Sequence, residues 1–372
     1  MSNSLLIQRK MESTLSQLLP EALATRRRAL AQMITGLHLA EHVHLSKVAG
    51  RIAGTAQLES KTRHLRRFLG NENVDPERFY SPVRDRLIEW AAQGAETQGS
   101  GPIRLLVDTV ELSGERQVLM AGIAYRRRAL PICWETYRRE GVTNAEQQIS
   151  LLKALVGRFP DEAEVVVVGD GAFHSTDLMD FIEDQGWHFC LRLHADTYIR
   201  SFKDSSKGFP KEGTWKQLRD LVPEEGERRY LQDVIVTKDN EYGPVGLALC
   251  QAEDEDDPWL ICTDREASYA TIRTYSRRMW IEQLFADLED GGFHLNRSRI
   301  YPPERLSRLV MALSWTYVWL LHVGAWMVKR GFRSKVDRTG RRDRSYVELG
   351  RRWLQRCLTN QIPLRIGIRP YF

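Results

Sequence analysis

The run of four consecutive valines in EVVVVGD, residues 164–170, limits most strongly what this chain can fold into. Apolar β-branched residues at every position indicate a strand that is buried on both faces, which is typical of an inner strand of a parallel sheet. An acid precedes the valines and Gly-Asp follows them, so the strand is short and ends at Asp170. The sequence therefore predicts a mixed α/β core organised around this strand.

The segments around the valine strand predict the order of this core. Three apolar runs upstream, IRLLVDTVEL, RQVLMAGIAY and RRALPICWETY, predict an antiparallel meander. We expect a helix over about 144–156 before the valine strand, a helix over 175–185 after it, and a further strand over 187–193. This β-β-β-α-β-α-β order is that of a ribonuclease-H-like domain, in which the first and fourth strands lie side by side.

Further features divide the 372 residues into five segments. Short strands with turns at Asp239–Asn240 and Gly243–Pro244 predict a β insertion that closes with the acidic run Glu253–Asp257. A Gly-rich polar linker is expected over Gly94–Pro102. The expected organisation is an all-α N-terminal domain (1–92), whose role in DNA binding is argued from its charge below, a first part of the ribonuclease-H-like core (100–194), the β insertion (195–262), a second part of the core (263–330) and a basic C-terminal segment (331–372).

The apolar stretch Leu309–Val328 is long enough to cross a bilayer. It contains His322 and has no second span to pair with, so we interpret it as a buried core helix, with a membrane anchor as the alternative, and expect no membrane partner. The five cysteines form no Cys-x-x-Cys pair, and Met1–Glu12 is polar and does not resemble a signal peptide. These features favour a cytoplasmic protein.

Charge is distributed unevenly along the chain. Residues 1–72 carry +6 and residues 297–372 carry +13, so the formal net charge of +5 leaves −14 for residues 73–296. Basic flanks around an acidic centre indicate a chain that binds a polyanion and collects carboxylates for divalent metal. Near the N-terminus, helices expected over 45–53 and 58–69 are separated by Gly54 and resemble a helix-turn-helix. The second helix presents Lys61, Arg63, Arg66 and Arg67 to DNA, unless the region is a plain basic helical bundle.

Three carboxylates are candidates for a metal site. Asp108 lies inside the apolar run LLVDTV, where an ionised side chain is costly without a compensating cation, and Asp170 ends the valine strand. Glu282 lies in Thr271–Asp290, which we expect to be one helix with Tyr275, Arg278, Glu282 and Glu289 along one face. The bland alternatives are a misjudged strand end, a turn aspartate and a solvated Arg278–Glu282 pair.

A ribonuclease-H-like order brings these acids together. If the first and fourth strands are neighbours, Asp108 and Asp170 project from one edge of the sheet, and the helix with Glu282 leans over it. Oxygen ligands of this kind suit hard divalent cations. We therefore expect two Mg²⁺ ions, with Mn²⁺ as a substitute, that catalyse in-line displacement at a DNA phosphate.

The motifs around these acids resemble those of the DDE transposases of the insertion sequence four family. YSRRMWIEQLFADL resembles the segment around the family's catalytic glutamate, with its Tyr-x2-Arg-x3-Glu spacing, and Glu289 stands where the family has a lysine. VDTVEL and GDGAFHSTDLMDFIEDQGWHFCLRL resemble its two aspartate motifs. The resemblance implies that Asp108, Asp170 and Glu282 are catalytic and bind the metals. It also implies that Tyr275 and Arg278 contact DNA phosphates, and that Trp259 stacks on a flipped base.

The function expected from these features is cut-and-paste DNA transposition. The enzyme would bind the terminal inverted repeats of its insertion sequence, cleave the DNA ends and join the 3′-hydroxyls to target DNA. The resemblance implies a homodimer on double-stranded DNA, because the two ends are paired before cleavage. Arg277, Arg297 and Arg299 are candidates to replace the missing lysine. The alternatives are a ribonuclease-H-like nuclease or resolvase, and a transposase relic that binds DNA without cleaving it.

Overall fold

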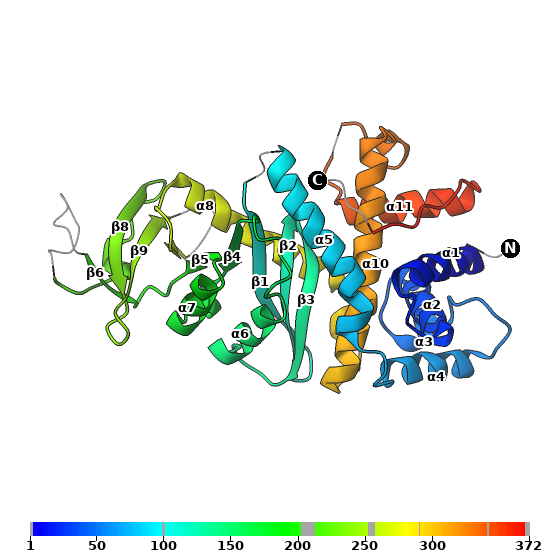
Figure 1. The fold of residues 1–372 in the computed structure, drawn as a ribbon. Helices are drawn as coiled ribbons and strands as arrows, with labels where there is room; N and C mark the ends of the chain where they lie inside the picture. The colour runs from blue at the N-terminus through cyan, green and yellow to red at the C-terminus, as the bar shows by residue number, and fades with distance from the viewer. Residues whose placement is uncertain are drawn as a thin grey trace.

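The structure, a computed structural model, describes residues 3–98, 101–201, 213–251, 257–289, 291–340 and 342–368. A mixed sheet occupies one side of an elongated molecule, and a helical bundle that contains the N-terminus occupies the other (Figure 1). Within the described residues the sheet has ten strands in the order β3-β2-β1-β4-β5-β10-β9-β8-β6-β7. The mixed α/β fold expected for the core is confirmed.

The first five strands form the predicted half of the sheet. They are β1 (Ile103–Leu112), β2 (Arg116–Tyr125), β3 (Arg128–Arg138), β4 (Val165–Gly169) and β5 (His188–Arg192). β1, β2 and β3 form the antiparallel meander, and β4 pairs in parallel with both β1 and β5. The first and fourth strands are therefore neighbours, as the predicted order requires.

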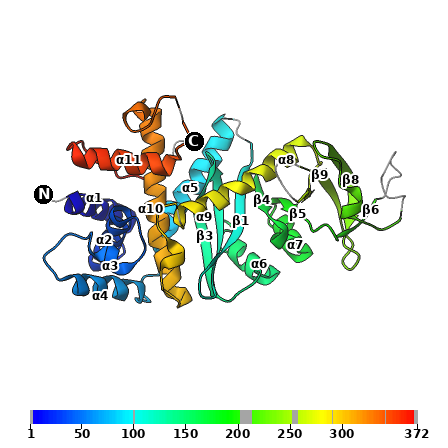
Figure 2. The ribbon, with the colours of Figure 1, turned by 180° about the vertical axis from the view of Figure 1, so that it is seen from behind.

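The helices on the two faces of this sheet have different roles. α6 (Ala145–Lys153) and α7 (Thr176–Asp184) connect β3 to β4 and β4 to β5, and they lie on one face (Figure 1). Asn144 caps α6 and accepts a hydrogen bond from the backbone of Gln147, whose side chain accepts one in return. α8 (Tyr269–Tyr275) and α9 (Met279–Leu288) lie on the opposite face (Figure 2). The second face therefore receives the segment that carries Glu282.

The β insertion extends this same sheet. Its strands are β6 (Tyr198–Ser201), β7 (Lys216–Gln217), β8 (Arg228–Val236) and β9 (Tyr242–Cys250), followed by β10 (Trp259–Thr263), with the 3-10 turn η2 (Leu218–Leu221) after β7. β10 pairs with both β5 and β9, so the hydrogen bonds run without a break from core to insertion. The turn expected at Gly243–Pro244 is wrong, because both residues lie inside β9. Residues 253–256 of the expected acidic run lie outside the described residues.

The N-terminal region is helical, as expected. Its helices are α1 (Asn3–Leu18), α2 (Ala24–Ala40), α3 (Leu45–Ala49), α4 (Leu58–Leu69) and α5 (Pro76–Gln98). α3 and α4 match the two helices expected for a helix-turn-helix. α5 packs against β3 and the long helix α10 (Pro303–Lys329). The linker predicted over Gly94–Pro102 is wrong as far as Gln98, because α5 continues to that residue.

The expected boundaries at residues 92 and 262 fall inside α5 and β10. α10 contains the apolar stretch, and 94% of its most apolar window is buried inside the fold, so the predicted core helix is confirmed. Judged by length and composition alone, α10 is long and apolar enough to cross a membrane, and no other helix in the described residues is. It stands between the sheet and the N-terminal helices and is joined by α11 (Tyr346–Thr359) (Figure 1). Two short 3-10 turns, η4 (Leu295–Arg297) and η5 (Arg333–Lys335), flank it.

Candidate active site

Asp108 and Asp170 lie together at the sheet edge that forms where the parallel pairing of β1 with β4 ends, because these two strands are in register. The last parallel pair between β1 and β4 joins Leu106 to Val168. Each aspartate follows its paired residue by two positions, so side-chain alternation sends both the same way. Gly169 lets the chain turn tightly here, since an added Cβ would lie 2.9 Å from Cβ and Cγ of Phe173. The strand-end placement predicted for Asp170 is confirmed.

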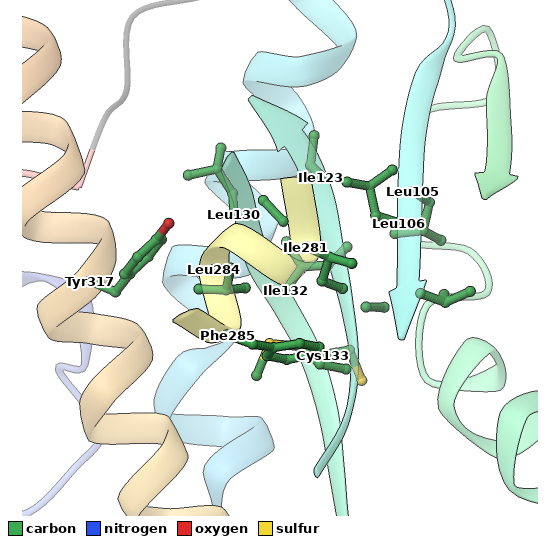
Figure 3. Close-up of a cluster of buried hydrophobic side chains, with 14 of the residues drawn as sticks. Leu105, Leu106, Ile123, Leu130, Ile132, Cys133, Ile281, Leu284, Phe285 and Tyr317 are labelled. Atoms are coloured by element: carbon green, nitrogen blue, oxygen red, sulfur yellow. The ribbon is translucent and has the colours of Figure 1, made fainter. Parts of the chain in front are cut away.

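Glu282 reaches this edge from α9, which is fixed by its apolar face. Ile281, Leu284 and Phe285 point from α9 toward side chains of β2 and β3 (Figure 3). The buried residues Ile281 and Leu284 have no exposed surface. Burial of two such side chains stabilises the contact by about 3–6 kcal/mol. The side chain of Glu282 remains 38% exposed, so α9 holds it at the surface of the sheet edge.

The segment expected as one regular helix is divided. The 3-10 turn η3 (Ser276–Arg278) separates α8 from α9, and Glu289 lies beyond the last residue of α9 with non-helical dihedral angles. Tyr275 is only 2% exposed. The predicted polar stripe from Tyr275 to Glu289 is therefore wrong, because a 3-10 turn changes the rotation per residue and the helix ends too early. Arg278 and Glu282 do lie together, one turn apart.

Arg278 joins the three acids. Its Nη1 lies 3.7 Å from Asp108 Oδ2 and 3.9 Å from Asp170 Oδ2, and its Nη2 lies 2.5 Å from Glu282 Oε1. The side chain of Arg278 is 14% exposed. Residues far apart in sequence thus converge on one cation, as the expected gathering of carboxylates requires. The bland alternative of a solvated Arg278–Glu282 pair does not fit this burial.

The electrostatics reflect crowding of negative charge. Burial, followed by the charge of Asp170, raises the pKa of Asp108 to about 7, with a smaller contribution from Glu282. Arg278 and the backbone N–H of Thr109 act in the opposite direction, and that N–H donates to Asp108 Oδ1 at 2.7 Å. Burial lowers the pKa of Arg278, but Tyr275 and the three carboxylates raise it by more. The pKa of Arg278 therefore lies above its ordinary value. The site is short of positive charge.

Two aromatic residues lie beside the acids. The rings of Trp259 and Tyr275 are 5.0 Å apart in an edge-to-face arrangement. Trp259 is half-buried at the start of β10, whereas Tyr275 lies beneath the surface. Burial raises the pKa of Tyr275 to about 12, although Arg278 and Arg192 oppose this. Trp259 is therefore partly open to solvent, whereas Tyr275 is not in this conformation.

A pair of histidines beside Asp170 was missed by sequence reasoning. Nδ1 of His174 lies 2.6 Å, and Nε2 of His194 2.7 Å, from the carbonyl oxygen of Gly171. Their ring centroids are 4.3 Å apart, and burial lowers the pKa of His174. The signal was the parallel pairing of β4 and β5, because residues that follow neighbouring parallel strands meet at the same edge. The pair holds the loop that carries Asp170.

The predicted DNA-contacting residues of α4 are not equivalent. Arg63, Arg66 and Arg67 are exposed. Lys61 is half-buried, and its Nζ donates to the carbonyl oxygen of Ile52 at 2.8 Å. The first three can reach a ligand in solution, whereas Lys61 holds the turn between α3 and α4.

The acids fit divalent metal by their chemistry. Three carboxylates gather around one cation, and the charges of Asp170 and Glu282 add to the effect of burial in raising the pKa of Asp108. Among the described residues, however, no group of three or more His, Cys, Asp or Glu side chains is arranged closely enough to hold a metal ion. Arg278 stands among the acids instead. A divalent ion bound here would compete with the guanidinium for the same carboxylate oxygens.

Comparison with known proteins identifies the family. A sequence model described as "Transposase DDE domain" matches residues 123–319, which is more than half of the chain. The chain belongs to this transposase family. The matched residues of the transposase include Asp170 and Glu282 and begin after Asp108. No curated protein matches the chain in sequence. The transposase is accordingly an enzyme that acts on DNA, and members of its family generally use divalent metals.

Proposed function

We propose that this transposase belongs to the insertion sequence four family and moves its element by cut-and-paste transposition. It binds the terminal inverted repeats, cleaves the DNA ends and joins the freed 3′-hydroxyls to target DNA. Asp108, Asp170 and Glu282 are its catalytic and metal-binding residues. The observation that carries this proposal is their convergence around Arg278.

The chemistry follows from the donor set. Two Mg²⁺ ions, or Mn²⁺ in their place, would activate a water or 3′-hydroxyl and stabilise the leaving oxygen in an in-line displacement. The three carboxylates supply hard oxygen ligands for such ions. Arg278 has the planar fork that binds phosphate as well as carboxylate, so we place it beside the reacting phosphate. Trp259 offers an aromatic face on which an unpaired base can stack.

The DNA-binding part of the proposal rests on charge and shape. α3 and α4 have the order of a helix-turn-helix, with Arg63, Arg66 and Arg67 exposed on the second helix. Recognition of the repeats is assigned to this helix. Two transposon ends must be held together for cut-and-paste transposition, so we expect a homodimer on DNA. Such a protein works at the bacterial nucleoid.

The test uses alanine variants of the three acids. Asp108→Ala, Asp170→Ala and Glu282→Ala should each abolish Mg²⁺-dependent cleavage of end DNA while a gel shift with the same DNA persists. Asp180→Ala, an exposed acid on α7, is the matched control and should cleave normally. Cleavage that survives in all three site variants would contradict the proposal.

Two further observations separate this function from its rivals. Short inverted repeats that flank the coding region, with a direct duplication outside them, would support an insertion sequence. Cleavage of branched DNA or hybrids without any need for these repeats would indicate a nuclease or resolvase instead. A wild-type protein that binds the repeats but never nicks them with Mg²⁺ or Mn²⁺ would be an inactive relic.

A further inference from the structure

A basic groove lies between the N-terminal helices and the catalytic part of the chain. It consists of two adjoining hollows of about 530 and 380 Å³ that share His44, Ser46, Arg299 and Tyr301. One wall comes from α3 and α4, and the other comes from the β1–β2 turn and residues 296–302. We call this the junction groove.

The charge of the junction groove has one sign. Its exposed cations are Lys47, Arg66, Arg297, Arg299 and Arg305. Of the described residues that line it, none is an aspartate or glutamate. None of the five cations forms an ion pair with a carboxylate in the described parts of the chain. Surface arginines and lysines usually have acids nearby, so this gathering points to an anionic ligand.

A buried histidine lies beside the cations of the junction groove. His42 lines the groove and is 7% exposed. Burial, and after it the nearby charges of Lys47, His294, His44 and Arg297, together lower its pKa to about 4. Protonation of His42, which would add one more positive charge to the groove, is therefore disfavoured.

The groove is held in shape by Arg116, which is 2% exposed. Its guanidinium donates to the carbonyl oxygens of Ser113 and Asn296 at 2.8 and 3.1 Å, and to Ser298 Oγ at 2.5 Å. Tyr301 covers it, with the guanidinium carbon 5.1 Å from the ring centroid. The β1–β2 turn and the segment after α9 are thereby fixed to one another, and the cations of that segment are pre-organised.

The α2–α3 connection is joined to the same segment. The backbone N–H of Val43 donates to the carbonyl oxygen of Phe293 at 2.8 Å. Arg305, in the first turn of α10, lies close to Gly70 at the end of α4. α4 lies beside this end of α10 (Figure 1). The groove therefore runs from α4, the predicted recognition helix, to the segment that follows α9, the helix that carries Glu282.

We propose that the junction groove binds the phosphate backbone of duplex DNA and holds the transposon end between the helix-turn-helix and the catalytic acids. The identity of the polyanion rests on the proposed function. β1 leads from the groove at Ser113 to Asp108, a path of about 17 Å at 3.3–3.4 Å per residue. The same length covers about five base pairs of duplex, so the bound phosphates lie roughly that far from the reacting one.

The test measures binding without cleavage. Fluorescence anisotropy with a labelled duplex of random sequence is recorded in EDTA over a range of salt concentrations. In the variant Lys47→Gln/Arg299→Gln/Arg305→Gln we expect a loss of affinity of about tenfold or more, and a salt slope of log K reduced by about 3, since each lost phosphate contact removes about 0.9. Because contacts to the phosphate backbone do not depend on base sequence, we expect the same loss of affinity with a duplex that carries the terminal repeat.

The matched control removes three charges elsewhere. Arg78→Gln/Arg86→Gln/Arg219→Gln replaces exposed arginines that do not line the groove and should bind DNA as the wild type does. If the groove variant unfolds, Lys47→Gln/Arg66→Gln, on helices α3 and α4, should reduce the slope by about 2. Thermal melting verifies that each variant is folded.

Three outcomes would overturn the inference. They are a groove variant that matches the control, a wild-type protein that binds no duplex in EDTA, and a loss confined to one sequence with an unchanged salt slope. Failure of the proposed function would look different. If the protein binds DNA through the groove but never cleaves it, the proposed enzymatic function is wrong and this inference stands. If the groove variant still cleaves DNA ends as the wild type does, this inference is wrong and the proposed function stands.

Discussion

Arg278 Nη2 lies 2.5 Å from Glu282 Oε1, one turn further along the chain. The same guanidinium approaches Asp108 and Asp170, so a single side chain carries the positive charge around which the three acids gather. It occupies the region in which the acids would hold divalent ions. Its removal should therefore have opposite effects with and without metal.

Arg278→Gln should lower stability in EDTA and raise affinity for divalent ions. Loss of the guanidinium leaves the acids without a counter-charge, and we expect a loss of about 1–3 kcal/mol in the free energy of unfolding, discounted for the exposure of Glu282. Calorimetric titration with Mn²⁺ should show tighter binding, because no cation competes. Arg86→Gln is the control, and equal Mn²⁺ affinity in wild type and variant would count against competition.

The stability of the folded protein should depend on pH through Asp108. Its pKa rises from 3.8 to about 7 on folding, so the folded state binds an extra proton between these pH values and stability falls as pH rises through this window. In EDTA, Asp108→Asn should match the wild type near pH 4 and exceed it by about 1–3 kcal/mol above pH 7. Urea unfolding at several pH values measures this, and a difference that does not change with pH would refute it.

Gly169→Ala should disturb the site through packing. The added methyl group would lie 2.9 Å from Phe173, and its accommodation would shift the turn that carries Asp170. We expect a loss of about 1–3 kcal/mol in stability and reduced DNA cleavage. Gly340→Ala has nothing within 4 Å and should change stability by less than about 0.5 kcal/mol. Equal melting temperatures for the two variants would show that Gly169 is not constrained.

Arg116→Lys should loosen the segment after α9. A lysine ammonium cannot reproduce the fork that reaches Ser113, Asn296 and Ser298 at once, so we expect a loss on the order of 2 kcal/mol. Hydrogen exchange of the amides in residues 295–301 should become faster, while that of α6 stays unchanged. Exchange that is unaltered in 295–301 would mean that other contacts hold the segment. Arg219→Lys, on an exposed arginine, is the control.

The core of the fold could be predicted because its strands have simple patterns. The valine strand is apolar at every position, and the meander consists of three apolar runs, so burial dictates both. The neighbouring position of β1 and β4 then placed Asp108 beside Asp170. The errors fall where local signals compete. Gly94 lies inside α5, and Gly243–Pro244 lies inside β9, although both have the composition of turns.

The finer geometry of the site could not be predicted from spacing. A helical pattern does not distinguish a regular turn from η3, so the burial of Tyr275 and the departure of Glu289 from the helix were missed. The place of Arg278 among the acids depends on how its side chain packs once β1, β4 and α9 are assembled. The contact between the rings of His174 and His194 likewise forms only in the folded chain.

The pairing of β10 with both β5 and β9 determines what the insertion contributes to the enzyme as a whole. The insertion is not joined by a flexible hinge, because backbone hydrogen bonds between strands fix its position relative to the catalytic strands. Excision of residues 195–262 would strip most of β10 from β5 and leave a bare strand edge open to neighbouring molecules. A trimmed enzyme is thus expected to self-associate, whatever its chemistry.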